Sequence, residues 1–272
     1  MEVLLHQIDA FADAPFSGNP AAVMPLPAWL PDSVLQQLAE ENNLAETAFY
    51  TAQLPPEAGA PPAGGPAYHL RWFTPAVEVA MCGHATLASA AQILTDIEPG
   101  QDAVSFYTRS GWLRVDRTDD DLYILDLPAV ASEPAEPDPA LVAALGIHPV
   151  RAFTGTDVVL VVDTERQVRD VVPALSSFPP VPRGVIVTAP GDEVDFVSRF
   201  FAPGVGVPED PVTGSAHAQL APLWGAELGR QRFVARQLSR RGGTLGVELA
   251  GDRVLLSGRC RRYLDGVVSL DF

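Results

Sequence analysis

Two segments of this chain are apolar or small on nearly every side, and they constrain its fold more than any other feature. They are HATLASAAQIL at 84–94 and SAHAQLAPLW at 215–224. A helix without a charged face belongs inside a protein rather than on its surface. We therefore expect each segment to form a helix that other elements surround.

The residues that precede the two segments also match. Each segment follows a strand ending in Phe-Xaa-Pro and then a loop rich in glycine and acid, WFTPAVEVAMCGHAT in the first half and FFAPGVGVPEDPVTGSAH in the second. Aligning Gly83-His84-Ala85 with Gly214-Ser215-Ala216 makes the halves look like one unit used twice. The pattern predicts an α+β fold of two similar domains, each a curved sheet around one buried helix. Pro222 inside the second segment predicts a kink or an early helix end.

A boundary between the domains is expected in the proline-rich, acidic segment that precedes the second half. PAVASEPAEPDPA at 128–140 lacks periodicity and is typical of a linker. We place the cut between 116 and 139, with a first domain at 1–118 and a second at 119–262. Proline and glycine also predict that PPEAGAPPAGGPA at 55–67 is a loop.

Composition excludes several classes of protein. The net charge of -16 argues against nucleic acid and anionic membranes as partners, because both need a positive face. All 18 basic residues are arginine, so no lysine can form a Schiff base or serve a P-loop. Two cysteines are too few for a disulfide framework or a structural zinc site. Without a targeting segment or an apolar run near the about 20 residues of a spanning helix, we expect a cytoplasmic protein.

The two glycine-led helix starts are the first candidates for binding. Each presents free backbone N–H groups and the positive end of a helix dipole. Facing one another across a cleft, they would form a site for a carboxylate. The helix dipole also disfavours the charged form of His84 and His217, so we expect both rings to be neutral.

Glu46 is the candidate for proton transfer. It lies in the predicted strand NLAETAFYT among apolar neighbours, and a buried carboxyl has a raised pKa that suits proton transfer near neutrality. A metal site built from Glu46, His84, Asp210 and His217 is conceivable, but no spacing such as HExxH supports it. A nucleophilic pair of Cys82 and His84 is disfavoured, because neighbours two apart rarely orient as thiol and base.

Five ordered motifs resemble the PhzF-like family of phenazine biosynthesis. They are GNPAAV, NLAETAF, CGHATLASA, EDPVTGSAHAQLAPLW and QLSRRGG, and together they span almost the whole chain. The resemblance implies a fold like that of diaminopimelate epimerase, with two pseudo-symmetric barrel-like domains and the active site between them. It also implies a C-terminal strand, about 263–272, that returns to the first domain, and it implies a homodimer.

The resemblance further implies an isomerase. The best-understood member of the family isomerises a dihydro-hydroxyanthranilate by moving a proton between ring carbons. Mapped by motif, Glu46 is the general acid/base, and the substrate is held and polarised by His84, Asp210 and Ser215. The residues implied to bind the small carboxylic acid substrate are Gly83 and Gly214, through backbone N–H, and Asn19 of the GNPAAV motif. One carboxyl that moves one proton needs no metal, flavin or nicotinamide, so we expect no cofactor.

Two alternatives stay open beside this interpretation. One is a binding module for small molecules or proteins with vestigial chemistry. The other is a cofactor-free epimerase, although the two facing cysteines of the epimerase relatives are not both present. Cys82 precedes the first glycine, but Thr213 precedes the second. The motifs leave the physiological substrate open, together with any link to a phenazine pathway.

Overall fold

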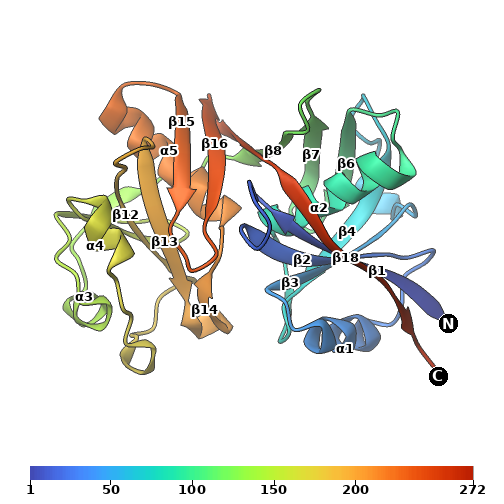
Figure 1. Cartoon of the computed structure of the whole chain (residues 1–272), viewed down its shortest axis with the longest axis horizontal. Coiled ribbons are helices and arrows are strands. Elements are labelled where there is room, and N and C mark those ends of the chain that lie inside the picture. Colours follow the sequence, from blue (N-terminus) through green and yellow to red (C-terminus); the bar gives the residue numbers. More distant parts are fainter. Residues whose placement is uncertain (272) are drawn as a thin grey trace. The chain divides into compact units, whose positions relative to one another are not determined.

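The computed structural model describes residues 1–271, and the chain divides into two compact units (Figure 1). Unit 1 contains Met1–Asp126 and the described residues from Ser257 onward, and unit 2 is Leu127–Leu256. Within residues 1–271, none of the helices combines the length and the apolar character needed to cross a membrane.

Unit 1 contains most of the first-half strands and receives the last strand of the chain. Its elements are β1 (Glu2–Ala10), β2 (Asn19–Pro25), α1 (Asp32–Asn42), β3 (Glu46–Thr51), a 3₁₀ turn (Pro56–Ala58), β4 (Ala67–Phe73), β5 (Glu78–Val79), α2 (Gly83–Gln92) with a π-helical extension (Ile93–Ile97), β6 (Ala103–Thr108), β7 (Gly111–Arg117), β8 (Tyr123–Pro128) and β18 (Cys260–Ser269).

Unit 2 has the same kinds of element in a similar order. They are β9 (Glu133–Ala135), α3 (Pro139–Leu145), β10 (Arg151–Thr154), β11 (Val158–Val161), α4 (Glu165–Arg169), a 3₁₀ turn (Leu175–Ser177), β12 (Val185–Pro190), β13 (Phe196–Ala202), a second 3₁₀ turn (Pro203–Val205), β14 (Val207–Asp210), α5 (Gly214–Leu228), β15 (Arg232–Gln237), β16 (Gly243–Ala250) and β17 (Arg253–Gly258).

Strand pairing shows that one ladder is used twice. In unit 1, β1 and β2 are antiparallel, β2 and β3 parallel, β3 and β4 antiparallel, β4 and β6 parallel, and β6 and β7 antiparallel. In unit 2 the same directions recur for β10 with β11, β11 with β12, β12 with β13, β13 with β15, and β15 with β16. Each unit also places a helix in the connection between its second pair of parallel strands, α2 between β4 and β6 in the first unit and α5 between β13 and β15 in the second. The predicted α+β fold with an internal repeat is therefore confirmed.

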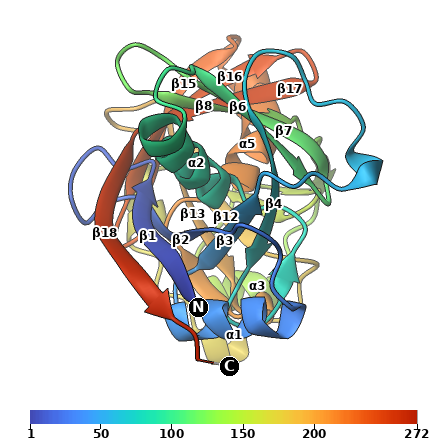
Figure 2. The same cartoon turned by 90° about the vertical axis from the view of Figure 1, so that its right-hand side faces the viewer.

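The sheet of unit 1 curls around α2. All ten residues of this helix are buried, and it contacts β1, β2, β3, β7 and β18, which include both ends of the ladder (Figure 2). Its alanines are small enough to let strands approach closely on every side. Its two mid-helix hydroxyls bond back to the helix, because Thr86 Oγ1 donates to the Cys82 carbonyl at 2.6 Å and Ser89 Oγ to that of Ala85 at 2.7 Å.

Helix α5 fills the same place in unit 2. The Trp224 ring stacks on Phe196 of β13 with centroids 5.4 Å apart, and its Nε1 donates to Thr188 Oγ1 of β12 at 3.1 Å. Of the kink or early helix end expected at Pro222, the early end is wrong, since the helix runs on to Leu228. Proline removes the N–H that would bond the carbonyl of Ala218, four residues earlier. Val130 supplies a replacement, and its N–H donates to that carbonyl at 3.2 Å.

The boundary between the units falls at Asp126/Leu127, within the predicted range of 116–139 but later than the cut at 118/119. Strand β8 pairs antiparallel with β7 through partners such as Arg114↔Asp126, so its residues up to Asp126 belong to unit 1. The return of the chain also begins earlier than residue 263. From Cys260 onward β18 pairs antiparallel with β1, where Glu2 lies opposite Ser269.

Because α2 has no free face, enlarging it should destabilise the protein. Ala90 is 0% exposed. Replacing it by leucine inserts three carbon atoms into a packed interior, and we expect the free energy of unfolding to fall by about 1–3 kcal/mol. Thermal and urea unfolding followed by circular dichroism measure the change.

Ala60→Leu is the matched control, because Ala60 is an exposed loop residue of the same unit. We expect it to stay within about 0.5 kcal/mol of the wild type. Equal effects of the two leucines would contradict the packing of α2.

Candidate functional site

The first group of candidate residues gathers at one edge of the unit 1 sheet. Strands β2 and β3 are parallel, with Ala21 opposite Glu46, so the first residues of both strands, Asn19 and Glu46, lie at the same edge. Helix α2 begins there with Gly83, and His84 is its second residue. The ladder thus positions three side chains that are far apart in the sequence.

His84 is the centre of this group. Its Nδ1 lies 3.1 Å from Asn19 Nδ2 and 3.5 Å from Cys82 Sγ, while its Nε2 lies 3.4 Å from Glu46 Oε2. An amide N–H and a thiol donate, so Nδ1 is the acceptor and the ring proton is on Nε2. The ring therefore presents an N–H on the side of Glu46.

Burial keeps the His84 ring neutral. Desolvation lowers its pKa from 6.5 to about 3, against a smaller opposing effect of a backbone hydrogen bond with Pro20. Neutrality was expected from the helix dipole, whereas the largest cause is burial. The 3.4 Å approach to Glu46 is therefore between a carboxyl group and a neutral ring, not an ion pair.

The Glu46 side chain is mostly enclosed, with 15% of its surface exposed. Its neighbour His84 carries no charge, so the contact between these two side chains is not an ion pair that a proton on the carboxyl would break. A carboxyl in this setting can accept a proton from a bound molecule and return it.

Cys82 lies closer to His84 than the spacing suggested. The expectation that residues two apart would not meet is wrong, because Cys82 precedes the helix in an extended conformation with φ −146° and ψ 112°, which turns its side chain toward the ring. A ring with a pKa of about 3 is nevertheless a weak base for a thiol near neutral pH.

Three possible metal-ligand atoms lie within 4.8 Å of one another in this group, one each from Glu46, Cys82 and His84. Glu46 approaches Nε2 and Cys82 approaches Nδ1. A metal binds a single imidazole through one nitrogen, so an ion between Glu46 and Nε2 would have the thiol on the other side of the ring. An ion bound through Nε2 would therefore not share all three ligands.

The second group lies at the start of α5 in unit 2. Asp210 ends β14 and is buried, and Thr213 Oγ1 donates a hydrogen bond to its carboxylate. Gln237 of β15 holds the loop between them. Its Oε1 accepts from the Thr213 N–H at 2.9 Å, and its Nε2 donates to the Asp210 carbonyl at 2.7 Å. The loop is thus fixed directly before Gly214, where the helix begins.

The side chain of Ser215, the second residue of α5, contacts an arginine. Arg183 Nη1 donates to Ser215 Oγ at 2.9 Å, and the same guanidinium pairs with the buried carboxylate of Asp157. His217, one turn into the helix, is fully buried and turned away from this contact. Its Nδ1 donates to the Thr213 carbonyl at 2.8 Å, and burial lowers its pKa to about 4.

Both helix starts lack a side-chain cap. Neither Cys82 nor Thr213, the residues at the cap positions, accepts a hydrogen bond from the first turn of its helix. The first backbone N–H groups of Gly83 and Gly214 are thus not taken by the cap side chains, which is the condition for anion binding at a helix start.

The structure therefore collects the expected residues into two groups. Asn19, Gly83, His84 and Glu46 form one in unit 1, and Asp210, Gly214 and Ser215 form the other in unit 2. The approach of Asp210 to Glu46 stays a prediction.

Several residues of the second group were missed from the sequence. Gln237 opens the QLSRRGG motif, so the motif was a usable signal for it. Arg183 and Asp157 stand in no recognised motif, and only the fold brings them to Ser215.

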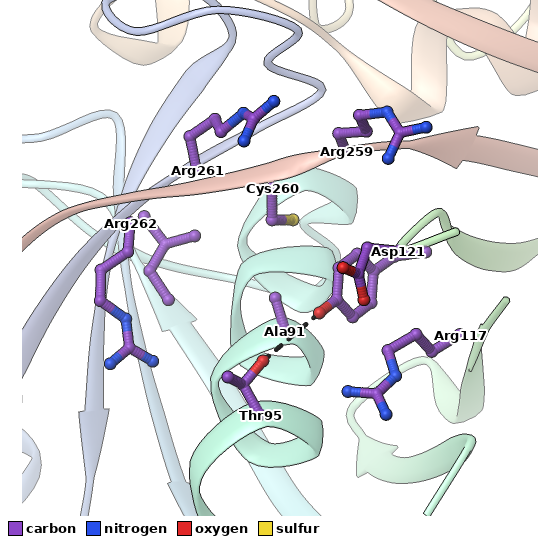
Figure 3. A pocket seen from close by; sticks show the side chains of 10 residues that line it. Ala91, Thr95, Arg117, Asp121, Arg259, Cys260, Arg261 and Arg262 are labelled. Atoms are coloured by element: carbon purple, nitrogen blue, oxygen red, sulfur yellow. Dashed lines mark hydrogen bonds between the residues drawn. The ribbon is translucent and has the colours of Figure 1, made fainter. Parts of the chain in front are cut away.

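A cavity of about 300 Å³ in unit 1 lies elsewhere (Figure 3). Ala91 and Thr95 line it from the far end of α2, about 10 Å along the helix from His84 at the usual rise per residue. Arg259 and Arg262 also line it, but they are paired with Asp120 and Asp96, and Arg117 Nη1 donates to the Leu94 carbonyl at 2.8 Å. These contacts join strands to the helix end, and the cavity holds none of the acid–base groups described above.

The fold of a ladder used twice, with a glycine-led helix inside each copy, is also found in other solved structures. A hydroxyproline epimerase from Agrobacterium vitis shares it, with a TM-score of 0.60 at 14% identity over 100% of this chain and 93% of that one. A phenazine biosynthesis protein of the PhzF family from Enterococcus faecalis is much more similar. Its TM-score is 0.91 at 40% identity, over 99% of this chain and 100% of that one.

The chain belongs to the phenazine biosynthesis-like protein family, whose model matches residues 8–266. An uncharacterized isomerase of Pseudomonas aeruginosa is 46% identical over 99% of this chain and 100% of its own length. The human phenazine biosynthesis-like domain-containing protein is 37% identical over 99% and 100%. The resemblance read from the five motifs is confirmed.

The neutral state of His84 predicts how the protein responds to acid. Between about pH 8 and about pH 5 the ring should stay unprotonated in the folded protein, so its C–H resonances in NMR spectra should not move. A histidine in an unstructured peptide titrates near about 6.5 and serves as the reference. A His84 midpoint near that reference value would contradict the described environment.

The same depressed pKa affects stability. The unfolded chain protonates this histidine below about pH 6.5, whereas the folded protein does so only near a pKa of about 3. The free energy of unfolding should therefore decrease as the pH falls between those values.

Proposed function

We propose that this protein is a cofactor-independent isomerase that moves a proton between two carbons of a small carboxylic acid. Glu46 is the general acid/base. The observation that carries the proposal is a mostly enclosed carboxyl group at the edge of the sheet, 3.4 Å from a neutral histidine and next to an uncapped helix start.

In this proposal the helix starts hold the acid group of the substrate. The N–H groups at Gly83 and Gly214 bind the carboxylate, and Ser215 and Asp210 take part from unit 2. We assign to His84 Nε2, which lies 3.4 Å from Glu46 Oε2, the role of donating to the Glu46 carboxyl when substrate is bound, and to Asn19 the role of keeping the ring in that tautomer. Glu46 removes a proton from one carbon of the bound acid and delivers it to another, so the carboxyl ends in the form in which it began.

The contacts give less support to an epimerase that uses two thiols. Such a reaction needs one thiol on each side of the reacting carbon. At the start of α5 the corresponding position is Thr213, whose hydroxyl is committed to Asp210. The second cysteine, Cys260, belongs to β18 of unit 1, with its Sγ 3.7 Å from the Leu87 carbonyl.

Glu46→Gln is the direct test of the proposed chemistry. The amide keeps the size of the side chain but cannot accept and return a proton. We expect transfer of solvent deuterium to carbon to fall by about 10²–10⁴-fold, with ligand affinity largely retained. Proton NMR of small carboxylic acids incubated with the protein in D₂O measures the exchange, and the rate should be unchanged after dialysis against a metal chelator.

Glu41→Gln is the matched control, because Glu41 is an exposed residue of helix α1 in the same unit. It should exchange deuterium at the wild-type rate. Wild-type exchange by the Glu46 variant would end the assignment of the acid/base.

We also propose that the protein is a homodimer, as the family resemblance implies. An apolar surface on β1 and β18 supports this. Leu4 and Val267 are paired in the ladder and are 50% and 56% exposed, and Tyr263 on the same strand as Val267 is 58% exposed. Exposed apolar side chains that cluster on one face are typical of an interaction surface.

If this surface is the dimer interface, a charge on it should separate the subunits. The double variant Leu4→Glu/Val267→Glu places two carboxylates at adjacent positions, where an apolar contact cannot solvate them. Multi-angle light scattering at micromolar concentration should give a dimer for the wild type and a monomer for the variant. Val234→Glu, at an exposed position of β15 in unit 2, should remain dimeric. A monomeric wild type would overturn the proposal.

A further inference from the structure

The repeated ladder points to Arg183 as the unit 2 counterpart of Glu46. Strand β3 follows α1 and pairs in parallel with β2, and β12 pairs in parallel with β11 in the same way. Glu46 is the first residue of β3, and Arg183 precedes the first residue of β12 by two positions. Each side chain meets the second residue of the helix in its own unit, His84 in one case and Ser215 in the other.

The Arg183 guanidinium has a fixed orientation. Its Nε donates to Asp157 Oδ1 at 2.8 Å, and its Nη2 donates to the other carboxylate oxygen. The Asp157 side chain is 0% exposed, so this is a two-point contact with an enclosed partner. The remaining Nη1 is thereby directed at Ser215 Oγ, 2.9 Å away.

Helix α5 holds Asp157 in place. Gln219, one turn after Ser215 on the same face, accepts from the Asp157 N–H at 3.0 Å and donates to its carbonyl at 2.9 Å. Gly155 leaves room for this contact, because a Cβ there would lie 2.7 Å from Gln219 Nε2. The start of α5, Asp157 and Arg183 therefore form one connected hydrogen-bonded network.

This network determines which way the Ser215 hydroxyl acts. Its oxygen accepts from Arg183, so its single proton is left to donate. Within residues 1–271 that proton has no acceptor, and the side chain of Arg183 is 32% exposed, so the contact is open to solvent. A donor of this kind beside an uncapped helix start suits the oxygen of a carboxylate.

We propose that Arg183 is a positioning residue for substrate recognition, which holds the Ser215 hydroxyl as a donor to the carboxylate of the substrate. The inference rests on the proposed function and adds a division of labour to it. Unit 1 supplies the group that moves the proton, and unit 2 supplies a fixed donor that recognises the acid group.

The simpler role for Arg183 is to neutralise Asp157. That role predicts a loss of stability when Arg183 is changed. It also predicts that the effect of Ser215→Ala on ligand binding is the same with and without Arg183. Removing the arginine alone would leave a buried carboxylate without a countercharge. The test therefore uses the double variant Arg183→Gln/Asp157→Asn. It removes both charges together and leaves an uncharged amide group at each position.

The experiment is a cycle of binding measurements with 2-aminobenzoate as the carboxylate probe. Isothermal titration gives its Kd for the wild type, Ser215→Ala, the neutral-pair variant, and the neutral-pair variant carrying Ser215→Ala. A lost hydrogen bond to a charged group corresponds to about tenfold or more in Kd, so Ser215→Ala should weaken binding by about that factor in the wild type. In the neutral-pair background the same change should cost less than about threefold, because the hydroxyl is no longer held.

Two controls separate recognition from folding. Arg236→Gln removes a partly exposed arginine that pairs with Glu193 in the same unit, and it should leave the Kd unchanged. The uncharged probe 2-aminobenzamide should bind the wild type and Ser215→Ala about equally. Thermal unfolding of each variant reports its stability separately.

An equal effect of Ser215→Ala in both backgrounds would overturn the role of Arg183. So would an unchanged Kd in Ser215→Ala. Either result leaves the proton-transfer proposal standing as long as Glu46→Gln abolishes deuterium exchange. Failure of the Glu46 test would instead remove the proposed function, whatever the binding cycle shows.

Discussion

Complete burial of a helix made of small residues is the constraint on which the rest of this structure depends. Every residue of α2 from Gly83 to Gln92 is enclosed, so strands must approach it from all sides, and a sheet can do so only by curling. Inside such a barrel the helix can keep a buried polar side chain only where that side chain has a hydrogen-bond partner, as Thr86 and Ser89 have in the helix backbone and Gln92 has in Tyr50. The first backbone N–H groups of the helix have no acceptor within the helix, so they need partners from outside it. Polar chemistry is therefore concentrated at the helix start, where the sheet edge supplies partners.

The two copies of the ladder use this common geometry differently. At the start of α2 the Glu46 carboxyl group lies beside His84, the second residue of the helix, and the His84 ring is uncharged. At the start of α5 the partner is a guanidinium whose charge is matched by a buried carboxylate. Different side chains near the start of the corresponding strands, Glu46 in β3 and Arg183 two residues before β12, thus give the two helices a carboxyl neighbour and a guanidinium neighbour. A duplicated scaffold can acquire unlike side chains at its two helix starts without a change in strand order.

The architecture and much of unit 1's candidate site were predictable, because they depend on patterns of a few consecutive residues. The all-round apolar character of 84–94 and 215–224 predicted buried helices, and the matching glycine loops predicted the repeat. Contacts that depend on tertiary placement were not predictable. Pro222 argued for an early helix end, but Val130, which is remote in sequence, supplies the missing N–H. No local sequence pattern marks Arg183 as a site residue. Its role depends on contacts with Asp157 and Ser215, which only the fold brings close to it.

The pairing of β18 with β1 affects the order in which the protein can form during synthesis. Glu2 lies opposite Ser269, so more than 200 residues are synthesised between the two strands of this ladder. Unit 2 is a continuous stretch, Leu127–Leu256, and all of it is synthesised before β18. Domains generally fold as units as the chain emerges from the ribosome. Unit 1, although its strands appear first, completes its sheet only after unit 2 has been made, and until then β1 exposes the hydrogen-bonding edge that β18 will cover.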